Sequence, residues 1–235
     1  MGKEQYETKT IVLKKRIDEL IAADIIEEKK TTPFRGRLMR PKREEVHIHS
    51  IKLFYESVLS VSGKYVADFY RKATHTISVD SSVREIVLGD GIFPIRTKSG
   101  FAKAFSSKKT KNKVDMRLKE HVFIEEEGQI FFDHHGKEIR FPFKINSKTI
   151  ENYPKRILQN NEPNVKRSEL KHEAVIDKLS KKLKKPLDPD VRNLNDELIV
   201  NEINEIYVPV FEARLIGPKK KVGILRLDAV RKKIL

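Results

Sequence analysis

The chain has 235 residues, 38% of them hydrophobic, which is enough to bury a core in one large or two small domains and excludes global disorder. The absence of cysteine excludes disulfides, thiolate zinc sites and cysteine nucleophiles. No apolar run approaches the roughly 18 residues of a membrane-spanning helix, and residues 1–15 lack the apolar core of a signal peptide. We therefore expect a cytoplasmic protein. A charged fraction of 35% without cysteine is a thermophile-like composition.

The net charge of +15 is unevenly distributed along the chain. Four segments are strongly basic, and the remaining residues are acidic overall. Such segregation predicts basic faces on an acidic body, which attract a polyanion such as nucleic acid, an anionic membrane or an acidic protein surface. The four segments are residues 29–43 with +7, residues 96–119 with +8, residues 166–185 with +5 and residues 214–233 with +7.

The first predicted element is an amphipathic helix over residues 8–28, because apolar residues recur there at spacings of three and four. Two interpretations stay open: the helix packs on its own domain, or it pairs with a second copy of the chain. Residues 29–43 then form a basic loop or arm. The inward positions of the helix are Leu13, Ile17, Leu20, Ile21 and Ile25.

A β-rich region follows over residues 45–95. Ser62-Gly63 predicts a turn after the first strand, and Asp90-Gly91 predicts a break before a short apolar segment. Residues 96–112 read as a mobile loop. Residues 114–143 then predict a meander of short antiparallel strands, with turns at Glu127-Gly128 and at residues 133–136.

Two helices are predicted after residue 166. The first spans residues 166–184 and carries lysines in its last turn, where they suit the helix dipole. The second is capped by Asp188-Pro189-Asp190 and directs Leu194 and Leu198 inward.

One pattern occurs twice. Residues 205–235 read as a strand, a turn at Gly217-Pro218 and a second strand, and residues 51–88 align with them. In this alignment Glu56 coincides with Glu212, and Asp80 with Asp228. We therefore predict an α+β fold of two duplicated antiparallel strand-turn-strand units that pack together, a central β meander, an N-terminal amphipathic helix and two helices after residue 166. The predicted division is residues 1–95 (helix, basic arm, first repeat), residues 96–160 (basic loop and meander) and residues 161–235 (two helices, second repeat).

Two groups of residues are candidates for a metal or catalytic site. His47 and His49 project from one face of a strand, and His134 and His135 offer further imidazoles. The repeated acids Glu56, Asp80, Glu212 and Asp228 are the carboxylates that a metal-dependent nuclease would use. Neither group has the spacing of a recognised metal or catalytic motif. We therefore expect ordinary strand and turn residues, with no metal, cofactor or catalytic role.

The favoured functional hypothesis is a non-catalytic nucleic-acid-binding protein that contacts the phosphate backbone without sequence preference, within a chromosome-, ribosome- or repair-associated assembly. The alternatives are an assembly module that forms a homo-oligomer or docks on a protein partner through the N-terminal helix, and a metal-dependent nuclease. DNA and RNA are both possible ligands. The predicted nucleic-acid-binding residues are Arg35, Arg37, Arg40, Lys42, Arg43, Lys98, Phe101, Lys103, Phe105, Lys108, Lys109, Lys111, Lys113, Lys181, Lys182, Lys184, Lys185, Lys219, Lys220 and Lys221.

Overall fold

The structure is a computed structural model that describes residues 6–34, 41–96, 112–187 and 189–235. It divides the chain into two compact units. The first comprises Met1–Lys64, Glu127–Leu183 and Ile199–Leu235, and the second comprises Tyr65–Glu126 and Lys184–Leu198. The predicted division into three segments stays a prediction.

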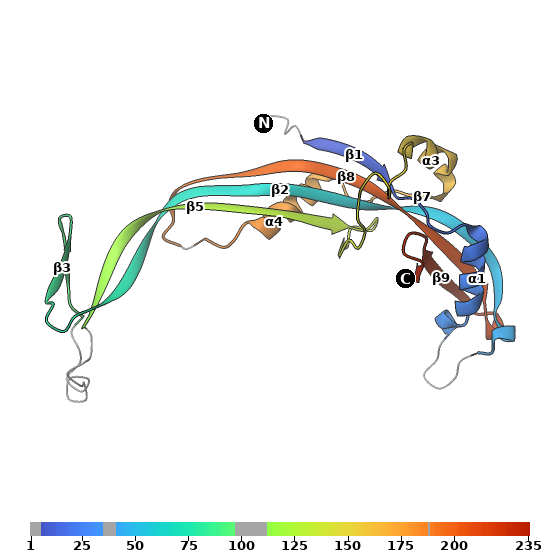
Figure 1. Cartoon of the computed structure of the whole chain (residues 1–235), viewed down its shortest axis with the longest axis horizontal. Coiled ribbons are helices and arrows are strands. Elements are labelled where there is room, and N and C mark those ends of the chain that lie inside the picture. The colour runs from blue at the N-terminus through green and yellow to red at the C-terminus, as the bar shows by residue number, and fades with distance from the viewer. Residues whose placement is uncertain (1–5, 35–40, 97–111, 188) are drawn as a thin grey trace. The chain divides into compact units, whose positions relative to one another are not determined.

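A large, mainly antiparallel sheet and three α-helices make up the described chain, which confirms a mixed α and β fold (Figure 1). Three long strands dominate it, and each contributes residues to both units. The strands are β1 (Glu7–Val12), β2 (His47–Val79), β3 (Glu85–Leu88), β4 (Gly91–Pro94), β5 (Asn112–Phe132), β6 (Glu138–Ile139), β7 (Val165–Lys166), β8 (Arg192–Ile216), β9 (Val222–Asp228) and β10 (Lys233–Ile234). The helices are α1 (Glu19–Lys29), α3 (Pro154–Asn160) and α4 (His172–Leu183), with 3-10 turns at Thr32–Phe34, Arg43–Glu45, Glu162–Asn164 and Pro218–Lys220.

The long strands β2 and β8 are neighbours in the sheet, in the order β10-β9-β8-β2-β5-β6. Strand β8 has two successive partners on its other edge: β1 runs parallel to it up to Tyr207, and β9 runs antiparallel from Val210 onward. Pro209 lies between these two pairings. Proline has no backbone N–H to donate. Pro209 therefore lies at the point of β8 where the pairing with β1 ends and the pairing with β9 begins.

Two glycines of the long strands lie beneath α4 in the first unit. A Cβ atom at Gly63 of β2 would come 3.0 Å from Cδ2 of Leu179 and 2.6 Å from the backbone oxygen of Ile199. A Cβ at Gly128 of β5 would come 2.8 Å from Cδ2 of Leu183. The predicted turns at Ser62-Gly63 and Glu127-Gly128 are wrong, because both glycines lie inside continuous strands and make room for helix side chains.

Helix α1 packs on the β8–β9 hairpin. Asp18 caps it by accepting a hydrogen bond from the N–H of Ile21, and Ala22 and Ile26 are buried against Phe211 and its neighbours. The predicted helix over residues 8–28 is therefore too long. Its first residues form β1 instead, because they complete the open edge of β8.

Two of the predicted inward residues lie on the exposed side of α1. Leu20 is 78% exposed and Ile21 is 43% exposed. Leu13 and Ile17 are buried, although they precede the helix. Ile25 is partly buried and packs against the core, as predicted. The spacing of three and four is therefore wrong for Leu20 and Ile21, because it is counted from residues that are not helical.

The region after residue 166 contains one of the two predicted helices. Helix α4 lies within residues 166–184 and buries Val175, Leu179 and Leu183. The second predicted helix is wrong, since Leu194 and Leu198 belong to β8. The apolar spacing there fits a helix, but the backbone continues the ladder next to β2.

The two stretches that align in the sequence adopt different structures. Residues 210–228 form a hairpin whose two strands are joined through Pro218–Lys220, as predicted. The first stretch lies mostly in the single strand β2 and then enters the β3–β4 hairpin. Strands β2 and β8 are paired, but the duplication is not confirmed.

The second unit consists of strand segments with alternating burial and a small hairpin. Side-chain contacts link its strands: Arg71 Nε donates to Glu120 at 2.8 Å, and Tyr70 stacks on His121 at 4.5 Å. Tyr65 donates from its hydroxyl to Asp196 at 3.1 Å. Polar pairs and ring stacking thus link β2, β5 and β8 in this unit.

Candidate anion-binding site

The turn after β9 is organised by one buried carboxylate. Asp228 is 1% exposed, and its Oδ1 accepts hydrogen bonds from the N–H groups of Val230 at 2.8 Å and Arg231 at 2.9 Å. Its Oδ2 accepts a third from Nε of Arg231 at 2.5 Å. Asp228 thereby caps the turn and fixes the guanidinium of Arg231.

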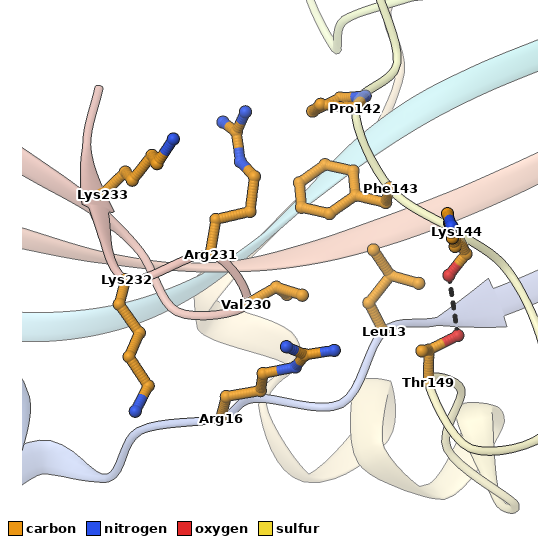
Figure 2. Close-up of a pocket in the computed structure, with 10 residues that line it drawn as sticks. All are labelled: Leu13, Arg16, Pro142, Phe143, Lys144, Thr149, Val230, Arg231, Lys232 and Lys233. Atoms are coloured by element: carbon orange, nitrogen blue, oxygen red, sulfur yellow. Dashed lines mark hydrogen bonds between the residues drawn. The ribbon is translucent and has the colours of Figure 1, made fainter.

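Arg231 contributes to a pocket of about 430 Å³ in the first unit (Figure 2). Its wall combines the C-terminal turn, the loop before α1 and the irregular segment that follows β6. Five of its ten residues are basic and none is acidic. The lining residues are Leu13, Arg16, Pro142, Phe143, Lys144, Thr149, Val230, Arg231, Lys232 and Lys233. We call it the basic pocket.

Backbone and side-chain contacts hold its walls together. The N–H of Arg16 donates to the carbonyl of Ala229 at 2.8 Å, which joins the loop before α1 to the C-terminal turn. The hydroxyl of Thr149 donates to the carbonyl of Lys144 at 2.8 Å and closes the loop that directly follows Phe143. The N–H of Lys14 donates to the carbonyl of Thr149 at 2.9 Å, so that three separate parts of the sequence are joined around one cavity.

The charges of the basic pocket are mostly unneutralised. Within the described part of the chain, no carboxylate forms an ion pair with Arg16, Lys144, Lys232 or Lys233. Arg231 is paired with Asp228, and its Cζ lies 5.1 Å from the ring centre of Phe143. Figure 2 shows the Arg231 guanidinium beside this ring. Cations grouped without acids attract an anion such as a phosphate.

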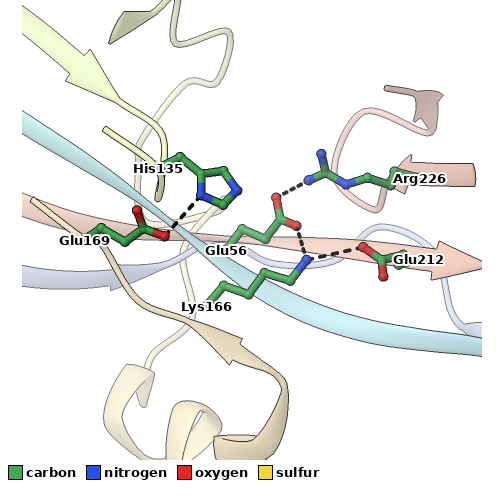
Figure 3. A network of polar contacts seen from close by, with 6 residues as sticks. All are labelled: Glu56, His135, Lys166, Glu169, Glu212 and Arg226. Carbon is green, nitrogen blue, oxygen red and sulfur yellow. Dashed lines mark hydrogen bonds and ion pairs between the residues drawn. The ribbon is translucent and has the colours of Figure 1, made fainter. Parts of the chain in front are cut away.

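The repeated glutamates lie in a different environment, a network of ion pairs (Figure 3). Nζ of Lys166 lies 3.1 Å from Oε1 of Glu56 and 3.2 Å from Oε2 of Glu212. Arg226 pairs with the other oxygen of Glu56. Glu56 and Glu212, which align in the sequence, therefore share one lysine on neighbouring strands.

The two aligned aspartates both organise turns. Asp228 holds Arg231, as described above, and Asp80 accepts hydrogen bonds from the hydroxyl and N–H of Ser82 in the second unit. These bonds lower the pKa of Asp80, with the hydroxyl bond as the larger cause. Among the described residues, no group of three or more His, Asp or Glu side chains is arranged to hold a metal ion.

The candidate histidines form two separate pairs. His47 and His49 are exposed on β2. The ring centres of His134 and His135 lie 4.0 Å apart. Nδ1 of His135 lies 3.2 Å from Oε1 of Glu169, as Figure 3 shows. Partial burial lowers the pKa of His134, and the nearby charges of His135 and Lys166 lower it further, while Glu56 and Asp133 act in the opposite direction.

Half of the predicted nucleic-acid-binding residues are outside the described residues. Of the others, Lys42, Arg43 and Lys113 are exposed, and Lys219, Lys220 and Lys221 form the exposed turn between β8 and β9. The residues that lie outside are Arg35, Arg37, Arg40, Lys98, Phe101, Lys103, Phe105, Lys108, Lys109 and Lys111.

The predicted lysines in and after the last turn of α4 are all paired with carboxylates. Lys181 lies 2.6 Å from Asp177 and Lys182 lies 2.7 Å from Glu138, both in the first unit. In the second unit, Lys184 lies 2.7 Å from Asp196, and Lys185 pairs with Glu126. The positive charge that the sequence places here is therefore locally offset.

The lining of the basic pocket was missed in the sequence, although two signals point to it. Lys232 and Lys233 belong to the basic segment over residues 214–233, in which only the lysine triplet 219–221 is among the predicted binding residues. The segment that follows β6 reads Arg-Phe-Pro-Phe-Lys over residues 140–144. Aromatic and basic residues alternate there as they do around Phe101 and Phe105, which are among the predicted nucleic-acid-binding residues.

None of the helices in the described chain has the length and apolar character needed to cross a bilayer. Comparisons of the whole chain with protein-family models, with curated proteins and with solved structures gave no significant match.

Proposed function

We propose that this protein binds nucleic acid through the phosphate backbone, without sequence preference, and that the basic pocket holds a phosphate. The observation that carries the proposal is the grouping of Arg16, Lys144, Lys232 and Lys233 around one cavity without a carboxylate partner in the described chain. Lysine amines act as point charges and suit backbone contact better than base reading.

A polymeric anion fits the charge distribution better than a small one. The exposed lysines 219–221 form a second basic site in the first unit, on the turn that enters β9. A phosphodiester chain contacts several such sites at once, whereas a single small anion occupies one. The net charge of +15 favours the approach of such a polyanion.

The test measures the affinity of the full chain for a fluorescent oligonucleotide by anisotropy at several salt concentrations. Each phosphate contact adds about 0.7 to 0.9 to the slope of log affinity against log salt. The double variant Lys144→Ala, Lys233→Ala removes two unpaired pocket cations. We expect the magnitude of its slope to fall by about 1 for each lysine.

The matched control is Lys181→Ala, Lys182→Ala, which removes the same total charge from an exposed helix end. Because both lysines are already paired with carboxylates, we expect a smaller loss of affinity and slope. Equal losses of affinity and slope in the two double variants would show that binding depends on the net charge alone and not on the basic pocket. Affinity that does not respond to salt would overturn the proposal.

A second candidate function is self-association through α1. It is favoured by the exposure of Leu20 at 78% and Ile21 at 43% on the outer side of this helix. Light scattering tests it on the full chain, with Leu20→Glu, Ile21→Glu as the variant. A monomer at all concentrations for the unsubstituted chain removes this candidate.

A further inference from the structure

A second pocket, of about 340 Å³, borders the basic pocket in the first unit. Its floor comes from alternate residues of four strands, and its rim comes from the segment that follows β6. Phe143 lines both pockets. The floor residues that matter here are Ser60 of β2, Gln129 and Phe131 of β5, and Asn204 of β8. We call it the aromatic pocket.

Three phenylalanine rings meet in the aromatic pocket. Phe131 and Phe141 are stacked, with ring centres 4.6 Å apart and planes inclined by 6°. Phe141 and Phe143 meet edge to face at 5.1 Å. All three are partly exposed, so ring surface remains available in the pocket. A flat aromatic ligand can stack on these rings.

One residue that lines the same pocket, Asn204, carries a buried polar atom without a partner among the described residues. Asn204 is 7% exposed, and its Oδ1 has no hydrogen-bond partner in the described structure. Two other polar side chains of the pocket satisfy each other, since Nε2 of Gln129 donates to the hydroxyl of Ser60 at 2.8 Å. Buried acceptors are almost always paired, so Asn204 lacks an N–H donor that a ligand can supply.

We propose that the protein binds single-stranded nucleic acid, with one base inserted in the aromatic pocket and a neighbouring phosphate in the basic pocket. The base stacks on the phenylalanine rings, and an N–H on its hydrogen-bonding edge donates to Oδ1 of Asn204. Phe143 adjoins both sites, so that adjacent parts of one nucleotide chain occupy them. This inference rests on the proposed function.

A duplex does not satisfy this arrangement. Its bases are stacked on each other, and their hydrogen-bonding edges are paired, so that a base has to leave the helix before it enters a protein pocket. The bases of a single strand are free to stack on protein aromatics, and such stacking tolerates every base. Selectivity for single strands therefore follows from the aromatic pocket, whereas salt dependence follows from the basic pocket.

The experiment compares three fluorescent probes of equal length by anisotropy on the full chain. They are a single-stranded DNA oligonucleotide, its duplex, and a single strand of abasic deoxyribose phosphates; a single-stranded RNA probe compares the two sugars. We expect the base-bearing single strand to bind about ten-fold more tightly than the abasic strand, because one stacked base contributes about that factor. The duplex is expected to bind more weakly than the base-bearing strand.

Two variants test the pocket itself. Phe141→Ala removes a stacking surface, and Asn204→Leu removes the unpaired acceptor. Each is expected to weaken binding of the base-bearing strand about five-fold or more, with little effect on the abasic strand. Asn204→Leu also removes an unsatisfied buried polar group, so it is expected to stay folded in thermal unfolding even if Phe141→Ala does not. Phe123→Ala is the matched aromatic control, because Phe123 is 61% exposed and lines neither pocket.

Two results would overturn the inference. One is equal affinity for the base-bearing and abasic strands, and the other is unchanged discrimination in both folded pocket variants. If Lys144→Ala, Lys233→Ala still reduces the salt slope in those cases, phosphate binding stands and only base insertion is wrong. If no probe binds in a salt-dependent way, the proposed function itself fails.

Discussion

Nε of Arg231 lies 2.5 Å from Oδ2 of Asp228, so that a buried carboxylate fixes one of the cations of the basic pocket. The other oxygen of Asp228 caps two backbone N–H groups of the same turn. The local order of the C-terminal turn and the direction of Arg231 thus depend on one side chain.

Asp228→Asn is expected to lower the free energy of unfolding by about 1–3 kcal/mol, because it removes the charge that satisfies a partly buried arginine. Urea denaturation measures the loss. The control is Asp177→Asn, whose ion pair with Lys181 is exposed and is expected to contribute less than about 0.5 kcal/mol. Equal losses at the two positions would contradict the structural role of Asp228.

Gly63→Ala is expected to destabilise the first unit by about 1–3 kcal/mol, because the new Cβ would lie 2.6 Å from the backbone oxygen of Ile199. Gly128→Ala is the informative comparison. Its Cβ meets only the end of the Leu183 side chain, at 2.8 Å, which can rotate away. We therefore expect the smaller loss at residue 128 in thermal or urea unfolding, and the reverse order would contradict the packing of α4.

Lys166→Met is expected to lower the free energy of unfolding by about 1–3 kcal/mol, because it leaves the half-buried Glu212 without its cation. Adding Glu212→Gln removes the uncompensated charge and is expected to restore part of the loss. The two substitutions then show a coupling energy of about 0.5–3 kcal/mol in a double-mutant cycle. Strict additivity would mean that the two residues do not interact.

The lowered pKa of His134 predicts a dependence of stability on pH. The folded state favours the neutral imidazole, chiefly through partial burial, so that the unfolded chain binds the proton first as the pH falls. The contribution of His134 to the free energy of unfolding is fully present above the ordinary histidine pKa of about 6.5. It is lost as the pH falls towards and through the lower pKa of His134 in the folded state. His134→Gln is therefore expected to lose less stability than the unsubstituted chain between about pH 7.5 and pH 5. Identical pH profiles in urea denaturation would contradict this prediction.

The sequence predicted the local elements whose pattern is self-contained. The β8–β9 hairpin follows from two apolar segments around Gly217-Pro218, and α4 follows from the spacing of four between Val175, Leu179 and Leu183. The turns predicted at Gly63 and Gly128 are wrong, because a glycine in a turn and a glycine that makes room for a helix cannot be distinguished in a sequence. The helix expected after Asp188 failed for a related reason, since pairing with a neighbouring strand overrode the local preference.

By itself, the sequence determined the excess of positive charge, the segments that carry it and the strong β pattern of residues 51–59 and 206–215. Only the tertiary structure decided which cations remain unpaired. Lys182 pairs with Glu138 and Lys185 pairs with Glu126, which are 44 and 59 residues away in the sequence. Arg16, Lys144 and Lys233, in contrast, line one cavity and have no carboxylate partner in the described chain. The physical reason is that ion pairing depends on distances of a few ångströms across the fold, which the order of residues along the chain does not specify.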